Sequence, residues 1–449
     1  YLFYLIETKE QLEKFSEYNL DRCYLEVIHH NPYCHHLISP ISLIFIKPFQ
    51  SRTGFILSID HTEGLNLDIN EVWDMISRKA GQIYVLNGKK VYSYPLPLES
   101  IFCIKTSKYL ESEDLIEEAK YNTSAHNYFY QRYPDRIDIN RIVPIAKQLK
   151  KYENLFSDIG WKESLFKSRY YKFYNRYANR VFSEIEQNPL TFDMDLLKEH
   201  FTLKNESFSI TDNKIYTNYN LFTLTGRPSN KFNGINFAGM DKHNDSRKFI
   251  IPSNDLLVEF DYTSYHLKIL CEMIDYRFAE NDIHAHLGKM YFNTDQLTDE
   301  QHDDSKGITF KLLYTDAKYN GCENIPFIDR VRDFKDSQWK KFQELGYVSS
   351  FISQRPIKNF TNKTQVLPYI LQNYETERNI LIISDLLSYL QTKISKLVLY
   401  TYDSFLIDYN KHDGAETLME IQNILEQDEF LTTCSFGKNY ANLKPLISI

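Results

Sequence analysis

The first part of the chain alternates short apolar runs with stretches of helical spacing. Runs rich in Val, Ile, Tyr and Phe predict strands at residues 23–28, 41–46, 55–59 and 83–86. Apolar residues recur every three or four positions in residues 8–18 and 69–79, which is typical of amphipathic helices. The pattern predicts an α/β domain at the amino-terminal end of the chain.

The pattern becomes helical over residues 138–200, and no glycine stands between Gly160 and Gly226 to interrupt it. Strand signals return at residues 256–260 and 397–409, and a long, mostly helical insertion separates them. A sheet whose strands are divided by helices in this way is α+β in character.

Composition limits the classes of protein to consider. The 449 residues suggest two to four domains. No apolar run approaches the ~20 residues of a membrane-spanning helix, so no membrane span is expected. The 52 Lys and Arg against 60 Asp and Glu give a net charge of -8, which argues against coating nucleic acid through bulk charge.

The six cysteines are scattered and include no CxxC pair, so a disulfide framework is not expected and a reducing compartment such as the cytoplasm is. The sequence begins with Tyr1 rather than Met, which leaves an organellar location open.

Two carboxylates stand at the ends of apolar strands. Asp261 follows the run Leu256–Phe260, and Asp403 lies at the bend between two β-like runs in residues 396–409. Each Asp by itself is more typical of a turn or a helix cap. Together they could meet at one sheet edge and supply the hard oxygen ligands that a pair of Mg²⁺ ions requires for phosphoryl transfer.

A third element changes that balance. On a helix over residues 305–314, Lys306, Phe310 and Tyr314 share one face at i, i+4 and i+8. An ammonium group and two rings on one face suit a nucleoside triphosphate, because the cation holds phosphates and the rings pack on base and sugar. The alternative is a helix that buries its rings while the Lys extends to solvent.

The order and spacing of these elements resemble the family A DNA polymerases, the bacterial DNA polymerase I group. The segment Asp261-Tyr262-Thr263-Ser264-Tyr265-His266-Leu267 is similar to that family's motif A, DYSxxEL, and Asp282-Ile283-His284 stands near its D-x-H. Motif B, RxxxKxxxFxxxYG, is matched by His302, Lys306, Phe310 and Tyr314. Motif C, HDE, corresponds to Tyr402-Asp403-Ser404.

Further segments resemble that family and extend the likeness over roughly residues 184 to 445. Residues 215–220 are similar to hTxxN, and residues 225–230, which include Arg227, are similar to TGRLSS. The resemblance implies a right-hand polymerase fold preceded by an α/β, RNase H-like exonuclease-like domain. The implied domains are 1–137, exonuclease-like and inactive, and 138–449, the polymerase: a reduced thumb (138–214), a palm (215–290 and 385–449) and fingers (291–384).

The resemblance also implies roles for single residues. Asp261 and Asp403, with the backbone carbonyl of Tyr262, would hold two Mg²⁺ ions, with Mn²⁺ as an alternative. The nucleotide would be contacted by Lys306, His302, Phe310, Tyr314, His266 and Arg227. Primer and template would be contacted by Arg227, Asn236, Ser404, Lys172 and Arg176.

Three positions depart from the family pattern. His266 stands where the family has a Glu that blocks the ribose 2'-hydroxyl, so weaker sugar discrimination is expected. His302 replaces an Arg that contacts the triphosphate, which predicts lower or pH-sensitive triphosphate affinity. Ser404 replaces the Glu of motif C, which removes one carboxylate near the metals.

Two regions look reduced. Only 21 residues, 194–214, stand where the family has a long helical hairpin of the thumb. A short thumb holds the duplex poorly, so the isolated chain is expected to have low processivity and to need a processivity or replisome partner. In the amino-terminal domain the expected DxE reads Tyr24-Leu25-Glu26, and the next expected acidic positions carry Asn87 or Cys103 instead. Loss of these ligands predicts loss of proofreading.

Two clusters have a functional and an ordinary interpretation. The cluster His29, His30, Cys34, His35 and His36 contains zinc-compatible ligands, but adjacent ligands in so short a segment are more typical of a surface loop. Residues 147–180 carry a local excess of positive charge interleaved with Tyr and Phe. This region is either a duplex-contacting stripe or an amphipathic helix with a solvated basic face.

The resemblance therefore implies a template-directed DNA polymerase that adds deoxynucleotides to a primer 3' end. Its compact form suggests replication or repair of a phage or other mobile element, in the cytoplasm of a bacterial or phage-infected cell. Two alternatives remain open. One is a polymerase with altered template or sugar choice, reverse transcriptase-like or template-independent. The other is a non-catalytic nucleic-acid-binding protein that retains the fold.

Overall fold

A computed structural model describes residues 2–32, 34–49, 51–112, 139–158, 163–200, 210–229, 235–240, 245–280, 282–315 and 325–446. The chain divides into two compact units. Unit 1 comprises residues 1–222 and 230–253, and unit 2 comprises residues 223–229 and 254–449.

Unit 1 contains a six-stranded sheet in the order β1-β4-β3-β2-β5-β6. Strands β2, β5 and β6 run parallel to one another, and β3 runs antiparallel between β2 and β4. The strands are β1 (Leu2–Ile6), β2 (Arg22–His29), β3 (Ile41–Pro48), β4 (Thr53–Ser58), β5 (Gln82–Val85) and β6 (Ile101–Cys103). The four predicted strands are confirmed as β2 to β5.

The helices of this region begin where the sequence supplies a cap. Thr8 and Gln11 form a capping box at the start of α1 (Lys9–Phe15), and Asp68 caps α2 (Ile69–Lys79). The apolar face of α2 packs into the same core as the sheet. Two further helices, α3 (Gly88–Val91) and α4 (Ile104–Ser112), follow β5 and β6.

The rest of unit 1 is mostly helical, with α6 (Ile139–Ile142), α7 (Ile145–Asp158), α8 (Arg169–Lys172), the π-helical turn η3 (Phe173–Ala178), α9 (Asn179–Glu186) and α10 (Met194–His200). The predicted helical run is interrupted by a strand, β7 (Leu190–Phe192). All three residues of β7 are buried, and the strand pairs on both sides, with β9 (Lys214–Ile215) and β10 (Ile250–Ile251). Pairing therefore overrides the local helical spacing.

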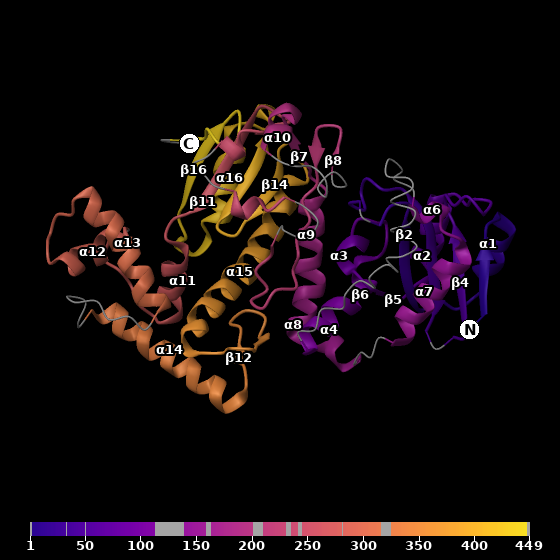
Figure 1. The fold of residues 1–449 in the computed structure, drawn as a ribbon, viewed down its shortest axis with the longest axis horizontal. Helices are drawn as coiled ribbons and strands as arrows, with labels where there is room; N and C mark the ends of the chain where they lie inside the picture. The colour runs from indigo at the N-terminus through magenta and orange to yellow at the C-terminus, as the bar shows by residue number, and fades with distance from the viewer. Residues whose placement is uncertain are drawn as a thin grey trace. The chain divides into compact units, whose positions relative to one another are not determined.

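Unit 2 is built on a five-stranded antiparallel sheet in the order β14-β15-β11-β16-β17 (Figure 1). The strands are β11 (Leu256–Tyr262), β14 (Lys396–Thr401), β15 (Ser404–Tyr409), β16 (Thr432–Gly437) and β17 (Lys444–Pro445). The two predicted strand regions are confirmed, and β14 and β15 form a hairpin. The central strand β11 comes from a part of the sequence more than 100 residues before its partner β15.

The helices of unit 2 are α11 (Tyr265–Met273), α12 (Ile283–Phe292), α13 (Asp299–Tyr314), α14 (Pro326–Leu345), α15 (Val366–Leu390) and α16 (Ala415–Leu425). Helix α15 packs against α11, α16 and β14, and α12 lies beside α13 (Figure 1). Helix α11 ends at Met273, and Asp275 just beyond it adopts a positive φ of 48°, which a continuing helix does not allow.

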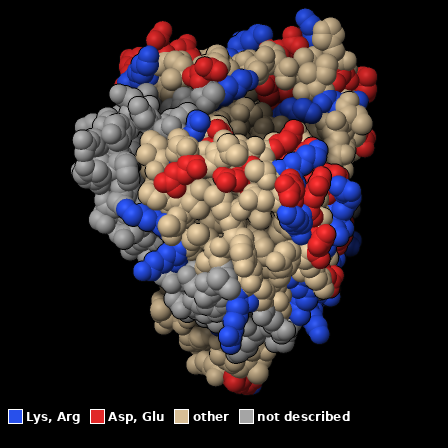
Figure 2. Space-filling model, turned by 90° about the vertical axis from the view of Figure 1, so that its right-hand side faces the viewer, with Lys and Arg blue, Asp and Glu red and all other residues tan. Residues whose placement is uncertain are grey.

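Basic and acidic side chains lie among one another on the face shown in Figure 2. Within the described ranges, no helix combines the length and the apolar character that crossing a membrane requires.

Candidate active site

Antiparallel pairing of β11 with β15 brings the two predicted aspartates together. Asp261 is the register partner of Ser404, which directly follows Asp403. The backbone N–H of Tyr262 donates to the carbonyl oxygen of Asp403 over 3.0 Å. The carboxylates at sequence positions 261 and 403 therefore belong to adjacent segments at one end of the sheet.

The electrostatics of Asp403 reflect this proximity. Burial raises the pKa of its carboxyl group to about 6, and the negative charges of Asp261 and Glu375 add to the shift. Arg227 opposes it by a smaller amount. A site that raises a carboxyl pKa in this way favours a cation, because a cation relieves the repulsion between the carboxylates.

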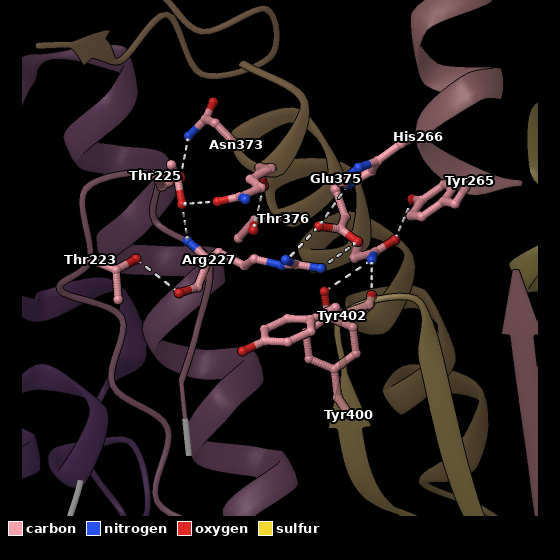
Figure 3. Close-up of polar contacts among 12 residues, drawn as sticks. Thr223, Thr225, Arg227, Tyr265, His266, Asn373, Glu375, Thr376, Tyr400 and Tyr402 are labelled. Atoms are coloured by element: carbon pink, nitrogen blue, oxygen red, sulfur yellow. Dashed lines mark hydrogen bonds and ion pairs between the residues drawn. The ribbon is translucent and has the colours of Figure 1, made fainter. Parts of the chain in front are cut away.

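The turn that presents Asp403 is tight and constrained. Tyr402 adopts a positive φ of 67°, a conformation that favours glycine. Its backbone carbonyl accepts a hydrogen bond of 2.7 Å from Nδ2 of Asn379 on α15, and the Arg227 guanidinium lies 3.6 Å from the centre of its ring (Figure 3). These contacts offset the backbone strain and hold the turn in place.

Arg227 is paired with a buried carboxylate on α15. Its Nε lies 3.1 Å from Oε2 of Glu375, whose side chain is only 2% exposed. The segment that carries Arg227 is anchored to the same helix, since Nδ2 of Asn373 donates to the carbonyl of Thr225 over 2.9 Å. Thr223 Oγ1 donates to the Arg227 carbonyl over 2.8 Å (Figure 3).

His266 lies on α11 beside the same carboxylate. Its Nε2 is 3.4 Å from Oε2 of Glu375, and its Nδ1 is 2.8 Å from the Tyr314 hydroxyl. Burial raises the pKa of Tyr314 to about 12, so its hydroxyl stays protonated near neutral pH. The structure thus joins motif-like residues from α11 and α13 through a hydrogen bond.

The remaining predicted nucleotide contacts lie on α13. Lys306 pairs with Asp303 over 3.0 Å, and His302 Nε2 lies 3.1 Å from Oδ2 of Asp282, the cap of α12. Phe310 is 46% exposed, and its ring stacks on that of Tyr314 at 5.8 Å. The exposed ring and the neighbouring cation share the helix face that the sequence predicted.

Ser404 has a carboxylate partner on the neighbouring strand. Its hydroxyl donates to Oε1 of Glu259 over 2.7 Å, and the Tyr440 hydroxyl donates to the same oxygen over 2.9 Å. Glu259 precedes Asp261 by two positions on β11, so both side chains emerge on one face of the sheet.

The other predicted primer–template contacts belong to unit 1. Asn236 is exposed before the 3₁₀ turn Phe237–Gly239, and Lys172 is exposed at the end of α8. Arg176 is exposed on η3 and pairs with Glu99 over 3.1 Å. Part of the basic segment 147–180, residues 159–162, lies outside the described residues.

Sequence reasoning missed three buried polar residues on α15, namely Glu375, Arg378 and Asn379. Arg378 donates to the hydroxyls of Tyr262 and Tyr265, and Asn379 accepts from Tyr265 over 2.6 Å. A signal was present, because the polar run 375–379 interrupts a long apolar helix. A polar run at such a place indicates a buried hydrogen-bond network.

The histidine cluster is largely buried and is not the surface loop that the sequence favoured, since His30, His35 and His36 are 4%, 5% and 7% exposed. Across the described ranges, no three or more His, Cys, Asp or Glu side chains gather as a metal-binding group. Both ring nitrogens of His29 lie within hydrogen-bond distance of protein atoms, the Ser39 carbonyl and the Tyr94 hydroxyl. Mg²⁺ keeps several waters and needs only one or two carboxylates besides substrate phosphates, which fits Asp261 and Asp403.

In unit 1 the three positions discussed for proofreading lie on the parallel strands or directly after them. Glu26 lies on β2, Asn87 follows β5, and Cys103 ends β6. The Cys103 sulfur accepts hydrogen bonds from the N–H groups of Gly88 and Thr106, at 3.1 and 3.4 Å. At two of the three positions the side chain is therefore not a carboxylate.

The fold of the chain is similar to that of a polymerase domain of known structure. A similar solved structure is the POL domain of Pol1 from M. smegmatis, in complex with DNA primer-template and dNTP. The likeness covers 98% of this chain and 99% of that chain, with a TM-score of 0.70 and 12% sequence identity. No protein-family model and no curated protein matches the sequence.

Proposed function

We propose that this chain is a template-directed DNA polymerase of the family A type, which extends a primer 3' end with deoxynucleoside triphosphates. The observation that carries the proposal is the approach of Asp261 and Asp403 at one end of the β11–β15 pair. The shared fold with a polymerase domain bound to primer-template and dNTP supports it. The subdivision into palm, fingers and reduced thumb belongs to the same proposal.

Asp261 and Asp403, with the Tyr262 carbonyl, would hold two Mg²⁺ ions. When bound, these ions would activate the primer hydroxyl and neutralise charge on the phosphates. Asp403 must be deprotonated to act as a ligand, which its pKa of about 6 permits at neutral pH. Lys306 and His302 would contact the triphosphate, and each would exchange its present acidic partner for a phosphate oxygen.

Phe310 and Tyr314 would form the nucleotide pocket, and His266 would face the sugar. The exposed ring of Phe310 supplies a surface for the incoming base. Arg227 would contact the primer end. Its guanidinium stacks on the ring of Tyr402, which places it beside the turn that carries Asp403. The chain would contribute mainly position and charge, as phosphoryl transfer requires.

Unit 1 would include an exonuclease-like domain without proofreading activity. Glu26 lies on β2, Asn87 lies just after β5 and Cys103 ends β6, so the set of hard oxygen ligands for a metal pair is incomplete. Exposed Lys172, Arg176 and Asn236 would contact the nucleic acid backbone.

A polymerase with altered template or sugar choice is the second candidate. It is favoured by Ser404, whose hydroxyl is engaged by Glu259, and by an imidazole at position 266. Labelled primers on DNA, RNA and no template, with each deoxynucleotide and then each ribonucleotide, separate the two candidates. Extension in Mg²⁺ that stops in EDTA and in Asp403→Asn supports a polymerase. Binding of primer-template without any extension would leave only a nucleic-acid-binding protein.

A further inference from the structure

Two polar nitrogen atoms from distant parts of the unit 2 sequence meet at one buried carboxylate oxygen. Glu375 Oε2 lies 3.1 Å from Arg227 Nε and 3.4 Å from His266 Nε2. None of the three atoms has a well-aligned hydrogen bond, although all are buried. The same Glu375 oxygen therefore interacts electrostatically with both the Arg227 guanidinium and the His266 ring (Figure 3).

The position of Glu375 determines which ring nitrogen of His266 carries hydrogen. A carboxylate facing Nε2 favours the proton on that nitrogen. In the neutral ring Nδ1 is then an acceptor, and it lies 2.8 Å from the Tyr314 hydroxyl. Because Tyr314 remains protonated, its O–H donates to Nδ1 and is directed away from other acceptors.

We propose that Glu375 is a positioning residue for sugar selection: it fixes His266, and through it the Tyr314 hydroxyl, so that neither group offers a partner to a ribose 2'-hydroxyl. This inference rests on the proposed polymerase function. A ribose 2'-hydroxyl that enters the pocket would lose its hydrogen bonds to water. Because the Tyr314 hydroxyl already donates to His266 Nδ1, it offers no replacement, and this disfavours ribonucleotides.

The carboxylate has moved to another helix in this chain. Position 266 on α11, where the family A resemblance implies a Glu, carries an imidazole, and the acid beside the Tyr314 partner comes from α15. Glu375 also pairs with Arg227, so the same acid links the sugar side of the pocket to the residue proposed at the primer end.

The test compares Glu375→Gln with a matched control. The control, Glu377→Gln, removes an equally buried carboxylate from the same helix. The Glu377 carboxylate accepts hydrogen bonds from the backbone N–H and the hydroxyl of Ser353, at 2.8 and 2.6 Å. Single-nucleotide incorporation is measured with deoxy- and ribonucleotides. We expect Glu375→Gln to lower the ratio of kcat/KM for deoxy- over ribonucleotide by about tenfold, the effect of one lost hydrogen bond to a charged group. The control should keep the parent ratio.

Two outcomes overturn the inference in different ways. If the parent extends primers and Glu375→Gln keeps its ratio, the positioning role is wrong while the polymerase function stands. If the parent does not extend primers, both fall. A readout independent of activity is the tautomer of His266, measured by NMR with labelled histidine. The Nε2–H form is expected in the parent and a mixture in Glu375→Gln, and an Nδ1–H form in the parent would refute the proposal.

Discussion

Tyr262 and Asp403 are joined backbone to backbone: the N–H of Tyr262 donates to the Asp403 carbonyl over 3.0 Å. This bond closes the end of the β11–β15 ladder beyond the Asp261–Ser404 pair. It fixes the register of two residues that lie 141 positions apart in the sequence. The backbone positions of Asp261 and Asp403 are therefore set by the sheet register.

Asp403→Asn should abolish primer extension and leave the fold intact. The amide is nearly isosteric but cannot supply the negative charge that Mg²⁺ requires. The loss should exceed about 100-fold, because altering groups that merely orient metal ligands already costs about 10- to 100-fold. Extension rates and circular dichroism measure the two effects. Glu420→Gln, an exposed position on α16, is the control, and extension by Asp403→Asn at the parent rate would point to a different site.

The same variant should stabilise the protein in a pH-dependent way. The Asp403 pKa is raised from 3.8 to about 6 on folding, so folding favours the protonated carboxyl. This contribution is fully present below about pH 4 and is lost as the pH rises through about 6. In EDTA, Asp403→Asn should exceed the parent by up to about 3 kcal/mol near pH 8, and by much less near pH 4.5. Urea unfolding at both pH values tests this, and an equal difference at both would contradict it.

Arg227→Lys should impair extension although it retains the charge. Lys cannot stack its ammonium on Tyr402 as the guanidinium does at 3.6 Å, nor place an Nε beside Glu375. We expect about a tenfold loss in kcat/KM for extension, since bidentate or stacked Arg sites lose about 1 to 2 kcal/mol on such a change. Arg332→Lys, an exposed residue paired with Asp329, should behave as the parent. If both variants extend primers with the same kcat/KM, Arg227 does not contribute to the active site.

The isolated chain should dissociate after adding few nucleotides. Leu190 on β7 is the register partner of Ile215 on β9, so the connection between them leaves and re-enters the same sheet. Only the 21 residues 194–214 lie between Asp193 and Ile215 to contact a duplex. Extension of a long primed template with a heparin trap measures the product length per binding event. Long products from single binding events would show that another region holds the DNA.

A buried ion pair should be important for the stability of unit 1. Lys89 Nζ lies 2.5 Å from Glu186 Oε1, and both side chains are buried. The Lys89 pKa is lowered by burial, an effect that Glu186 opposes. Lys89→Met should destabilise by about 3 to 5 kcal/mol because it leaves a buried carboxylate without its main partner. Adding Glu186→Gln to Lys89→Met should recover part of that loss in urea unfolding, and strictly additive losses would show that the two groups are not coupled.

Much of the architecture followed from local patterns. The strands β2 to β5, β11, β14 and β15 were predicted because apolar β-branched and aromatic runs persist when such strands are buried. The helix that carries Lys306, Phe310 and Tyr314 was predicted because the three residues repeat at helical spacing. Strand β7 was missed, since its identity depends on two partners that lie elsewhere in the sequence.

The sequence by itself determined which residues could perform the chemistry: two aspartates after apolar strands, and a cation with two rings on one helix face. Only the tertiary structure decided that Glu375 meets His266 and Arg227 across intervals of more than 100 residues. The physical reason is range. Periodicity and motif spacing act over a few turns, whereas the partner of a buried charge is chosen by how whole helices pack on the sheet.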